Sequence, residues 1–275
     1  MDGERAVQFL PNQRLHGRVH PLRHLIFDGA GNLYGTTSQG GAYGNGSVFQ
    51  LAPGIVKWTE KVLYSFCSAR GCADGRDPSA SLIFDAAGNL YGTTAHGGAY
   101  TKCSVGCGIV FELTPGTNGW TEAVLHSFGK SRDGGFYPVA GLIFDTAGNL
   151  YGVTYAGGVH GAGTAFELKP TAGGGWTEKV LHAFDDDDGY EPDTGLIFDA
   201  SGNLYGNASG GIYALGTAFE LKKPKAGREL DGEGAAQLRR RKGRLRYRDR
   251  CGPRCRRKSL RHDGKGRRSR RRYSI

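Results

Sequence analysis

The sequence predicts an all-β fold, namely a β-propeller-like array of four-stranded antiparallel blades. Three observations support it: internal repeats, a high glycine content, and short strand-like blocks separated by turns. Glycine makes up 47 of the 275 residues and proline only 10, a composition that neither a helix bundle nor a coiled coil tolerates. Glycine has no three-residue period, which excludes collagen, and no apolar run reaches the roughly eighteen residues of a membrane span.

Four copies of one repeat cover most of the chain. The pattern LIFD followed by GNLYG begins at Leu25, Leu82, Leu142 and Leu196. The steps between copies are 57, 60 and 54 residues. Each copy continues with an apolar block such as GSVFQLAP from Gly46, and the first three copies close with a Trp-led block such as WTEKVLYSF from Trp58. A period of this length is typical of propellers and other repeat architectures.

Each block has the composition of a β-strand. The blocks are short, rich in β-branched and aromatic residues, and bounded by Gly, Pro, Asn or Asp. In the Trp-led block Val62, Tyr64 and Phe66 alternate with Leu63 and Ser65. We expect the first three to share a face that packs on a neighbouring sheet, because side chains alternate along a strand. One repeat therefore contains four strands.

A turn signal separates the first two strands of every repeat. Asp-x-x-Gly-Asn occurs at 28–32, 85–89, 145–149 and 199–203. Asp accepts hydrogen bonds from nearby backbone amides, and Gly followed by Asn suits the positive φ of a hairpin turn. A β-solenoid is the alternative, but solenoid coils are shorter and lack this hairpin. We therefore expect residues 25–221 to form four propeller blades.

The motifs LIFDxxGNLYGTT, GxVFEL and WTExVLYSF resemble the GloVer tandem repeat of bacterial "choice-of-anchor" proteins. The resemblance covers about residues 25–221. It implies a repeat architecture in an extracellular or cell-surface protein that is held by varied C-terminal anchors, and it implies no particular reaction. This sequence shows no signal peptide or anchor segment, so the expected localisation rests on the resemblance alone.

Both ends of the chain differ from the repeats. Residues 222–275 hold 23 of the 36 Lys and Arg and 5 of the 26 acidic residues, whereas residues 1–221 carry 13 basic and 21 acidic residues. Codons for LDGEGAAQLR, from Leu230, can encode WTEKVLHSF after a shift of one base, and MDGERAVQFL, from Met1, can encode WTEKELYSF. We therefore hypothesise that residues 1–24 are a poorly ordered out-of-frame remnant and that residues 222–275 are a frameshift product.

The two frame changes are expected between about Gln13 and Leu25 and between Lys222 and Arg228, which would make the chain a fragment of a longer repeat protein. A tail with dense like charge and few apolar residues cannot offset its ordering entropy, so we expect disorder. Its arginine runs, Arg239–Lys242 and Arg267–Arg272, predict only non-specific binding of nucleic acid through phosphate contacts.

The six cysteines form three close pairs. Cys67 and Cys72 flank one loop, and Cys103 and Cys107 flank another, so in an exported protein we expect two disulfides. Free thiols and a four-thiolate zinc site are the alternatives, although the spacing is looser than a CxxC pair. The third pair, Cys251 and Cys255, lies in the shifted tail.

Four loops begin with Gly-Gly and place an aromatic or His residue two positions later. These residues are Tyr43, Tyr100, His160 and Tyr213. On one face of a propeller they could stack on a glycan or peptide ligand of the cell surface. The alternative is that they pack on the adjacent blade. His126 and His182 occupy the position of Tyr64 and, like the Trp residues, are expected to be structural.

The sequence indicates no catalytic residue, cofactor or metal. Asp185–Asp188 and the acidic residues after them could offer oxygens to calcium, but Asp-Gly recurs at the equivalent turns and favours an exposed acidic turn. Neither GxSxG nor HExxH is present. We expect a non-catalytic scaffold or binding module. The alternatives are a propeller enzyme, lyase-like or lactonase-like, with a site at the channel mouth, and nucleic-acid binding through the tail.

Overall fold

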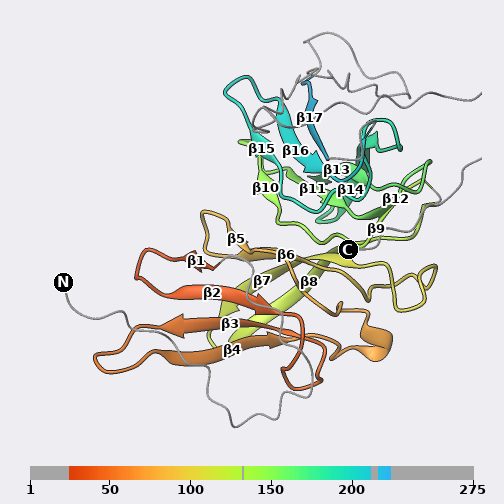
Figure 1. Ribbon diagram of the computed structural model, residues 1–275. Coiled ribbons are helices and arrows are strands. Elements are labelled where there is room, and N and C mark those ends of the chain that lie inside the picture. Colours follow the sequence, from red (N-terminus) through yellow and green to blue (C-terminus); the bar gives the residue numbers. More distant parts are fainter. Residues whose placement is uncertain (1–24, 132, 212–215, 224–275) are drawn as a thin grey trace, which may run out of the picture. The chain divides into compact units, whose positions relative to one another are not determined.

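The fold is all-β, as predicted. The computed structural model describes residues 25–131, 133–211 and 216–223, and within them it contains β-strands and one short 3-10 helix, η1 (Arg70–Cys72) (Figure 1). The predictions about frame changes and about the basic tail concern residues outside these ranges. Tyr213, Cys251 and Cys255 also lie outside these ranges.

The described strands form four small antiparallel sheets in which neighbours in sequence are neighbours in space. The first blade consists of β1 (Ile26–Phe27), β2 (Leu33–Thr37), β3 (Ser47–Ala52) and β4 (Thr59–Ser65). The second consists of β5 (Ile83–Phe84), β6 (Leu90–Thr94), β7 (Ile109–Gly116) and β8 (Gly119–Ser127). The arrangement is that of propeller blades, which confirms the predicted fold.

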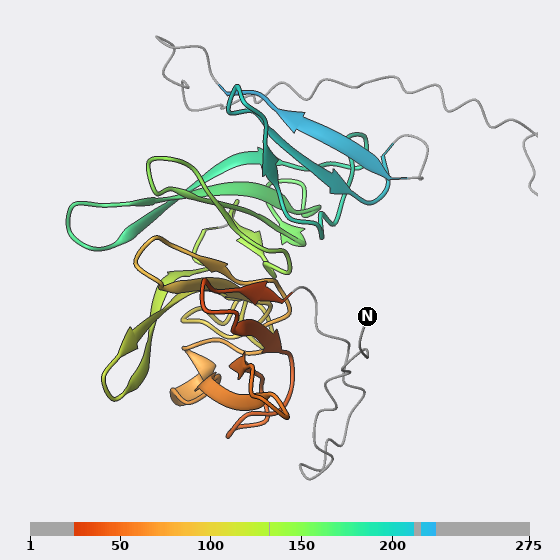
Figure 2. The same cartoon turned by 90° about the vertical axis from the view of Figure 1, so that its left-hand side faces the viewer.

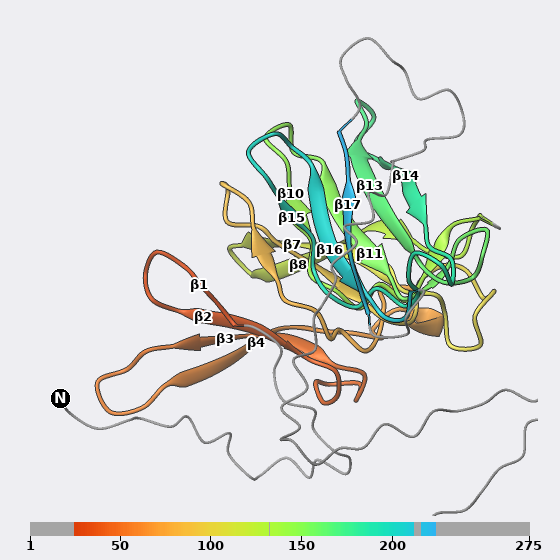
Figure 3. The same ribbon diagram turned by 45° about the horizontal axis from the view of Figure 1, so that its top comes forward.

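The third and fourth blades repeat this order (Figure 3). The third consists of β10 (Ile143–Phe144), β11 (Leu150–Thr154), β13 (Thr164–Pro170) and β14 (Trp176–Ala183). The fourth has three described strands, β15 (Ile197–Phe198), β16 (Leu204–Ala208) and β17 (Thr217–Leu221). A separate small pair joins β9 (Gly135–Phe136) to β12 (Ala156–Gly157).

One hydrogen-bonded turn links the first two strands of each blade, at what we call the turn end. In the third blade Asp145 Oδ1 accepts from the backbone amides of Ala147 and Asn149, both at 2.9 Å. Its Oδ2 accepts from the Asn149 side chain at 2.8 Å and from the Tyr151 hydroxyl at 3.1 Å. Gly148 supplies the positive φ, 83°, which a side chain would make costly. The predicted hairpin is confirmed, with Asn serving as a side-chain donor.

The tyrosine of the same turn connects it to the middle of the sheet. The Tyr151 hydroxyl also lies 2.8 Å from Glu167 Oε1 on β13, so its single proton is shared between the Asp145 and Glu167 carboxylates. Burial and the Glu167 carboxylate together raise the pKa of Tyr151. In the first blade Gln50 replaces the glutamate, and its amide donates to the Tyr34 hydroxyl at 2.8 Å.

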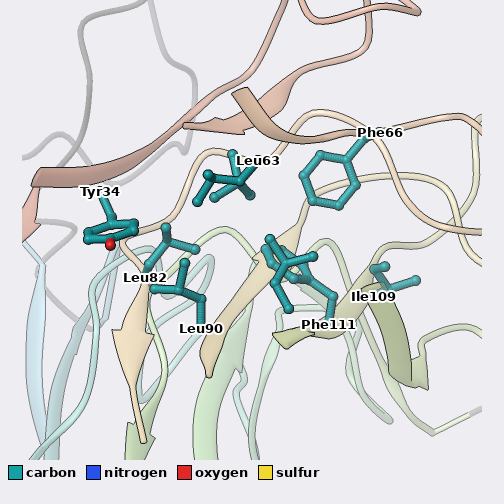
Figure 4. Close-up of a cluster of buried hydrophobic side chains, with 9 residues drawn as sticks. Tyr34, Leu63, Phe66, Leu82, Leu90, Ile109 and Phe111 are labelled. Carbon is teal, nitrogen blue, oxygen red and sulfur yellow. The ribbon is translucent and has the colours of Figure 1, made fainter. Parts of the chain in front are cut away.

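Hydrophobic side chains join each blade to the next (Figure 4). Tyr34, Leu63 and Phe66 of the first blade meet a second set from the next blade: Leu82, Leu90, Ile109 and Phe111. Two further clusters join the second blade to the third and the third to the fourth. Trp120 and Trp176 pack against two of these clusters, in agreement with their predicted structural role. Blade-to-blade contact therefore provides the core.

The prediction that Val62 shares the packed face of the Trp-led strand is wrong, because this strand contains a β-bulge. Phe49 pairs with Val62 and Val48 pairs with Tyr64, so Leu63 is the extra residue. Val62 is consequently 48% exposed, whereas Leu63 is 8% exposed and packs against the second blade. Register shifts at the same place in the second and third blades make Leu125 and Leu181 the extra residues there. The bulge turns a leucine inward, because an extra residue reverses the alternation of faces.

Candidate functional site

The end of each blade opposite the turn end carries the long connections, and we call it the loop end. Its described segments are 38–46, 66–82, 95–108, 128–131, 133–142, 155–163 and 184–196. Asp77, Tyr137 and Glu191 occupy equivalent positions there, each directly before a proline that leads into the next blade. Their φ values are 57°, 60° and 53°, in the left-handed region. We call these three the junction residues.

Backbone hydrogen bonds hold the junction residues in this conformation. The amide of Asp77 donates to Asn45 O at 2.9 Å, and the Asp77 carbonyl accepts from Ala95 N at 3.1 Å. Tyr137 makes the same two bonds, to Cys107 O and from Tyr155 N, both at 2.9 Å. Asp77 and Tyr137 therefore tie the loop of one blade to the following blade, and the amide of Glu191 donates to Ala162 O in the loop of the third blade at 2.8 Å.

A non-glycine residue in this conformation costs about 1 kcal/mol that glycine would avoid. The chain nevertheless places a polar side chain at all three junctions, although it uses glycine freely at other left-handed positions. The backbone bonds at these positions do not involve the side chains, so the side chains can differ without loss of those bonds. Backbone outliers of this kind are typical of functional sites.

The first junction carries an Asp–His pair. Asp77 Oδ2 lies 2.9 Å from His96 Nδ1 and 3.4 Å from Arg76 Nε. Burial raises the pKa of Asp77, but the hydrogen bond with His96 and the charge of Arg76 outweigh burial and hold that pKa below its usual value. The side chains of Asp77 and His96 are each about one-third exposed, at 29% and 32%. The pair is therefore accessible to a ligand.

The second junction, at Tyr137, is in contact with the Asp–His pair of the first. The His96 and Tyr137 rings lie 5.2 Å apart, centroid to centroid, at 57°. At the third junction the Tyr155 hydroxyl is hydrogen-bonded to Glu191, which raises the pKa of Tyr155 together with a smaller effect of burial. Tyr155 remains 37% exposed. Carboxylates, hydroxyls and aromatic rings thus recur along the loop end, where they can bind hydroxyl groups and stack on an apolar ring face.

The same groups offer limited catalytic chemistry. An Asp–His pair can act as a general base when a nucleophile is within hydrogen-bond reach of the imidazole. In the part of the chain that the structure describes, no Ser, Thr or Cys side chain is hydrogen-bonded to the His96 ring. Nor does this part contain a group of three or more His, Cys, Asp or Glu residues arranged to hold a metal ion.

The aromatic and His residues predicted from the Gly-Gly loops lie at the loop end in different environments. Tyr43 is 53% exposed, and its carbonyl accepts from the Asn45 side chain at 2.8 Å. His160 is exposed, whereas Tyr100 is half-buried beside Gly129 of its own blade. Among the described residues, two of the predicted side chains are therefore presented to solvent.

Both expected cysteine pairs lie in loop-end segments. The structure joins Cys67 to Cys72 and Cys103 to Cys107 in disulfides, with Cα atoms 4.0 and 5.2 Å apart. The first bond closes residues 67–72, directly before the segment that contains Asp74, and the second closes residues 103–107, which lead to β7. Both bonds restrict the freedom of the unfolded chain, and Cys103 and Cys107 also belong to the hydrophobic cluster between the second and third blades.

His126 and His182, the two histidines predicted to be structural, each contact a carboxylate near a blade interface. Ala165 pairs with His182 and Val110 with His126, as Val48 does with Tyr64. Each of these three residues contacts a carboxylate. The Tyr64 hydroxyl donates to Asp74 at 2.8 Å, His182 Nε2 lies 2.8 Å from Asp188, and His126 Nε2 lies 3.3 Å from Glu178. The predicted equivalence of His126 and His182 with Tyr64 is confirmed.

One carboxyl at these interfaces is strongly perturbed. Burial, aided by the negative charge of Asp74, raises the pKa of Glu122 to about 7. Glu122 Oε1 is buried without a hydrogen-bond partner. The acidic turn at 185–188 behaves differently, because Asp185 and Asp188 accept bonds from their own backbone.

The junction residues were missed by sequence reasoning, which concentrated on the Gly-Gly loops. The usable signal was the X-Pro pair before three of the LIFD motifs, RDP, FYP and YEP, in which the residue before proline varies. The pairing of Asp77 with His96 had no such signal, because it joins residues that are 19 positions apart in two different loops.

Comparison with known proteins shows one family. The model of the Gloeobacter/Verrucomicrobia repeat matches residues 2–228. No protein of curated function matches the chain. Among the described residues no helix has the length and apolar character needed to cross a membrane.

Two solved structures are similar in part. A bifunctional GH43-CE protein of Bacteroides eggerthii matches over 74% of this chain, with 15% identity and a TM-score of 0.41. A Trypanosoma rangeli sialidase in complex with the inhibitor DANA also matches over 74%, with 14% identity and a TM-score of 0.41. The matches cover 24% of the first protein and 36% of the second, so the chain spans well under half of either.

Proposed function

Because the chain belongs to the Gloeobacter/Verrucomicrobia repeat family, we propose that it is a non-catalytic scaffold of the cell surface that binds glycans at its loop end. The single observation that supports this is the contrast between constant backbone and varied side chain at the junctions. Asp77, Tyr137 and Glu191 share one strained conformation, and the amide of each donates to a carbonyl in the loop of the preceding blade, yet the three present different chemical groups. Such variation on a fixed frame suits recognition of an asymmetric ligand.

Glycan is the ligand class that suits these groups best. Sugar hydroxyls donate to carboxylates such as Asp77 and Glu191, and the apolar face of a pyranose stacks on an aromatic ring such as Tyr137. The exposed Tyr43 and His160 extend the same chemistry along the loop end. The two disulfide-closed loops reduce the entropy that would be lost on binding.

Hydrolysis is a second candidate function, favoured by the Asp77–His96 pair. It would require a nucleophile or an activated water delivered to His96, since no such side chain is bonded to that ring in the described ranges. Turnover of chromogenic glycosides or esters that disappears in His96→Ala would favour this function over binding alone.

The test is binding of the full chain to a panel of immobilised oligosaccharides at 0.5 M salt, which screens contacts made through charge alone. The expected result is binding to a subset of glycans, weakened at least fivefold by His96→Ala or Tyr137→Ala. Lys179→Ala, an exposed change on β14, is the matched control and should bind like the wild type. Absence of glycan binding, or binding that both loop-end variants leave intact, would refute the proposal.

A further inference from the structure

Each internal blade junction contains the same aromatic pair. The tyrosine of the turn end in one blade meets, edge to face, the phenylalanine of LIFD in the next blade. The centroid distances are 5.1 Å for Tyr34–Phe84, 5.0 Å for Tyr91–Phe144 and 5.2 Å for Tyr151–Phe198. One contact geometry therefore serves all three junctions between the described blades.

The first blade exposes one half of this junction. Phe27, the equivalent of Phe84, is 65% exposed. Leu25 is 37% exposed, although its three equivalents Leu82, Leu142 and Leu196 are at most 2% exposed. The side of the first blade that corresponds to a blade's contact with its predecessor is thus open at these two residues.

The fourth blade exposes the other half. Val48, Val110 and Ala165 face the following blade and are 0% exposed, whereas the equivalent Ala218 is exposed. The Tyr205 ring has no aromatic partner among the described residues, although its hydroxyl is bonded to Glu220 at 2.8 Å. The side that would contact a following blade is therefore open as well.

The fourth sheet also differs from the others at its outer edge, where β17 is its last described strand. Within the described residues β17 is bonded only to β16, and Figure 2 shows β17, in blue, at the margin of its sheet. The equivalent strands β3, β7 and β13 are each covered by a Trp-led strand. All three Trp of the sequence belong to those strands or directly precede them, so the chain has no fourth Trp-led block for β17.

We propose that a second copy of this chain packs its first blade on the fourth blade of the first copy. Phe27 of one copy then meets Tyr205 of the other, and Leu25 covers the surface around Ala218, as their equivalents do at the three internal junctions. The two surfaces are complementary because they are the two halves of one repeated interface. A second copy is the occupant that already carries the required surface.

The association is head-to-tail. Each copy contributes a different surface, so an interface between two identical surfaces would bring Phe27 against Phe27 or Ala218 against Ala218, and neither pair exists at the internal junctions. Head-to-tail contacts close into a ring or extend into a filament according to the rotation between copies. This inference is independent of the proposed glycan binding, because it uses the blade faces and not the loop end.

The experiment is sedimentation of the full chain over a wide concentration range at 0.5 M salt, which suppresses contacts made through the basic residues. The wild type is expected to increase in mass with concentration. Phe27→Ala and Ala218→Arg should each weaken association at least tenfold. Both positions are exposed, so neither substitution removes a core side chain.

Mixing the two variants distinguishes head-to-tail association from other modes. The Phe27→Ala chain keeps an intact fourth blade and the Ala218→Arg chain keeps an intact first blade, so the mixture should form dimers and nothing larger. Tyr43→Ala, an exposed aromatic residue at the loop end, should associate like the wild type. A wild type that stays monomeric, or association that both blade-face variants leave unchanged, would overturn the proposal.

Discussion

The turn end and the loop end of each blade arise from the same repeat but obey different constraints. At the turn end Asp, Gly, Asn and Tyr are the same in all four copies, and their side chains make the hydrogen bonds that close the turn. At the loop end backbone groups make the bonds of the junction residues, and the junction side chains differ. Residue identity is therefore fixed where side chains build the fold, and it is free where the backbone alone does so.

The largest expected effect is at the turn end. Asp145→Ala removes the acceptor of four hydrogen bonds and leaves part-buried donors unpaired, so the free energy of unfolding should fall by about 2–3 kcal/mol. Asp145→Asn keeps one oxygen for the two backbone amides and should lose about 1 kcal/mol. Urea unfolding at pH 7 measures both. Equal losses in the two variants would show that the backbone acceptor role is not what stabilises the turn.

A smaller effect, of opposite sign, is expected at the interface carboxyl Glu122. Its pKa rises from 4.5 to about 7 on folding, so the native state binds the proton more tightly and stability falls as the pH rises from about 4.5 to 7. Glu122→Gln removes this penalty. It should raise the free energy of unfolding by about 1–2 kcal/mol at pH 8, after allowance for partial solvent screening, and leave it unchanged near pH 4.

Glu60 provides the control for that measurement. It occupies the equivalent position in the first blade and is exposed, so Glu60→Gln should change stability little at either pH. Urea unfolding of both variants between pH 4 and 8 gives the comparison. A Glu122→Gln variant whose stability follows the wild type across this range would mean that the carboxyl is solvated in solution.

The smallest effect is expected at the junction. Tyr137→Gly relieves the left-handed strain but loses the ring contact with His96 and adds freedom to the unfolded chain, so its stability should stay within about 1 kcal/mol of the wild type. Tyr137→Ala keeps the strain and should be about 1 kcal/mol less stable than Tyr137→Gly. Thermal unfolding of the pair measures the difference. An alanine variant as stable as the glycine variant would argue against strain at this position.

The sequence was sufficient to predict the blade and its turn because both depend on short-range patterns. LIFD, GNLYG and the Trp-led block each contain a complete strand, and the Asp145 turn is closed within seven residues. The number of units and the contact between them followed from the repetition. These features required no knowledge of how distant segments pair.

The rest depends on pairing across the fold. The bulge at Leu63 is defined by the register between β3 and β4, so alternation along β4 alone placed Val62 wrongly. The left-handed conformation of Asp77 is held by Asn45 and Ala95, which belong to two different blades. The loop-end chemistry follows from these contacts, and for that reason the prediction included Tyr43 and His160 but not Asp77 or His96.

The uniform Tyr–Phe contact also bears on how such chains change over time. Since every unit carries both halves of one interface, a gene can gain or lose units by recombination between its own copies without any new surface having to evolve. The number of units can therefore change without a change in the stability of each unit. The loop-end side chains of each duplicated copy can then diversify independently.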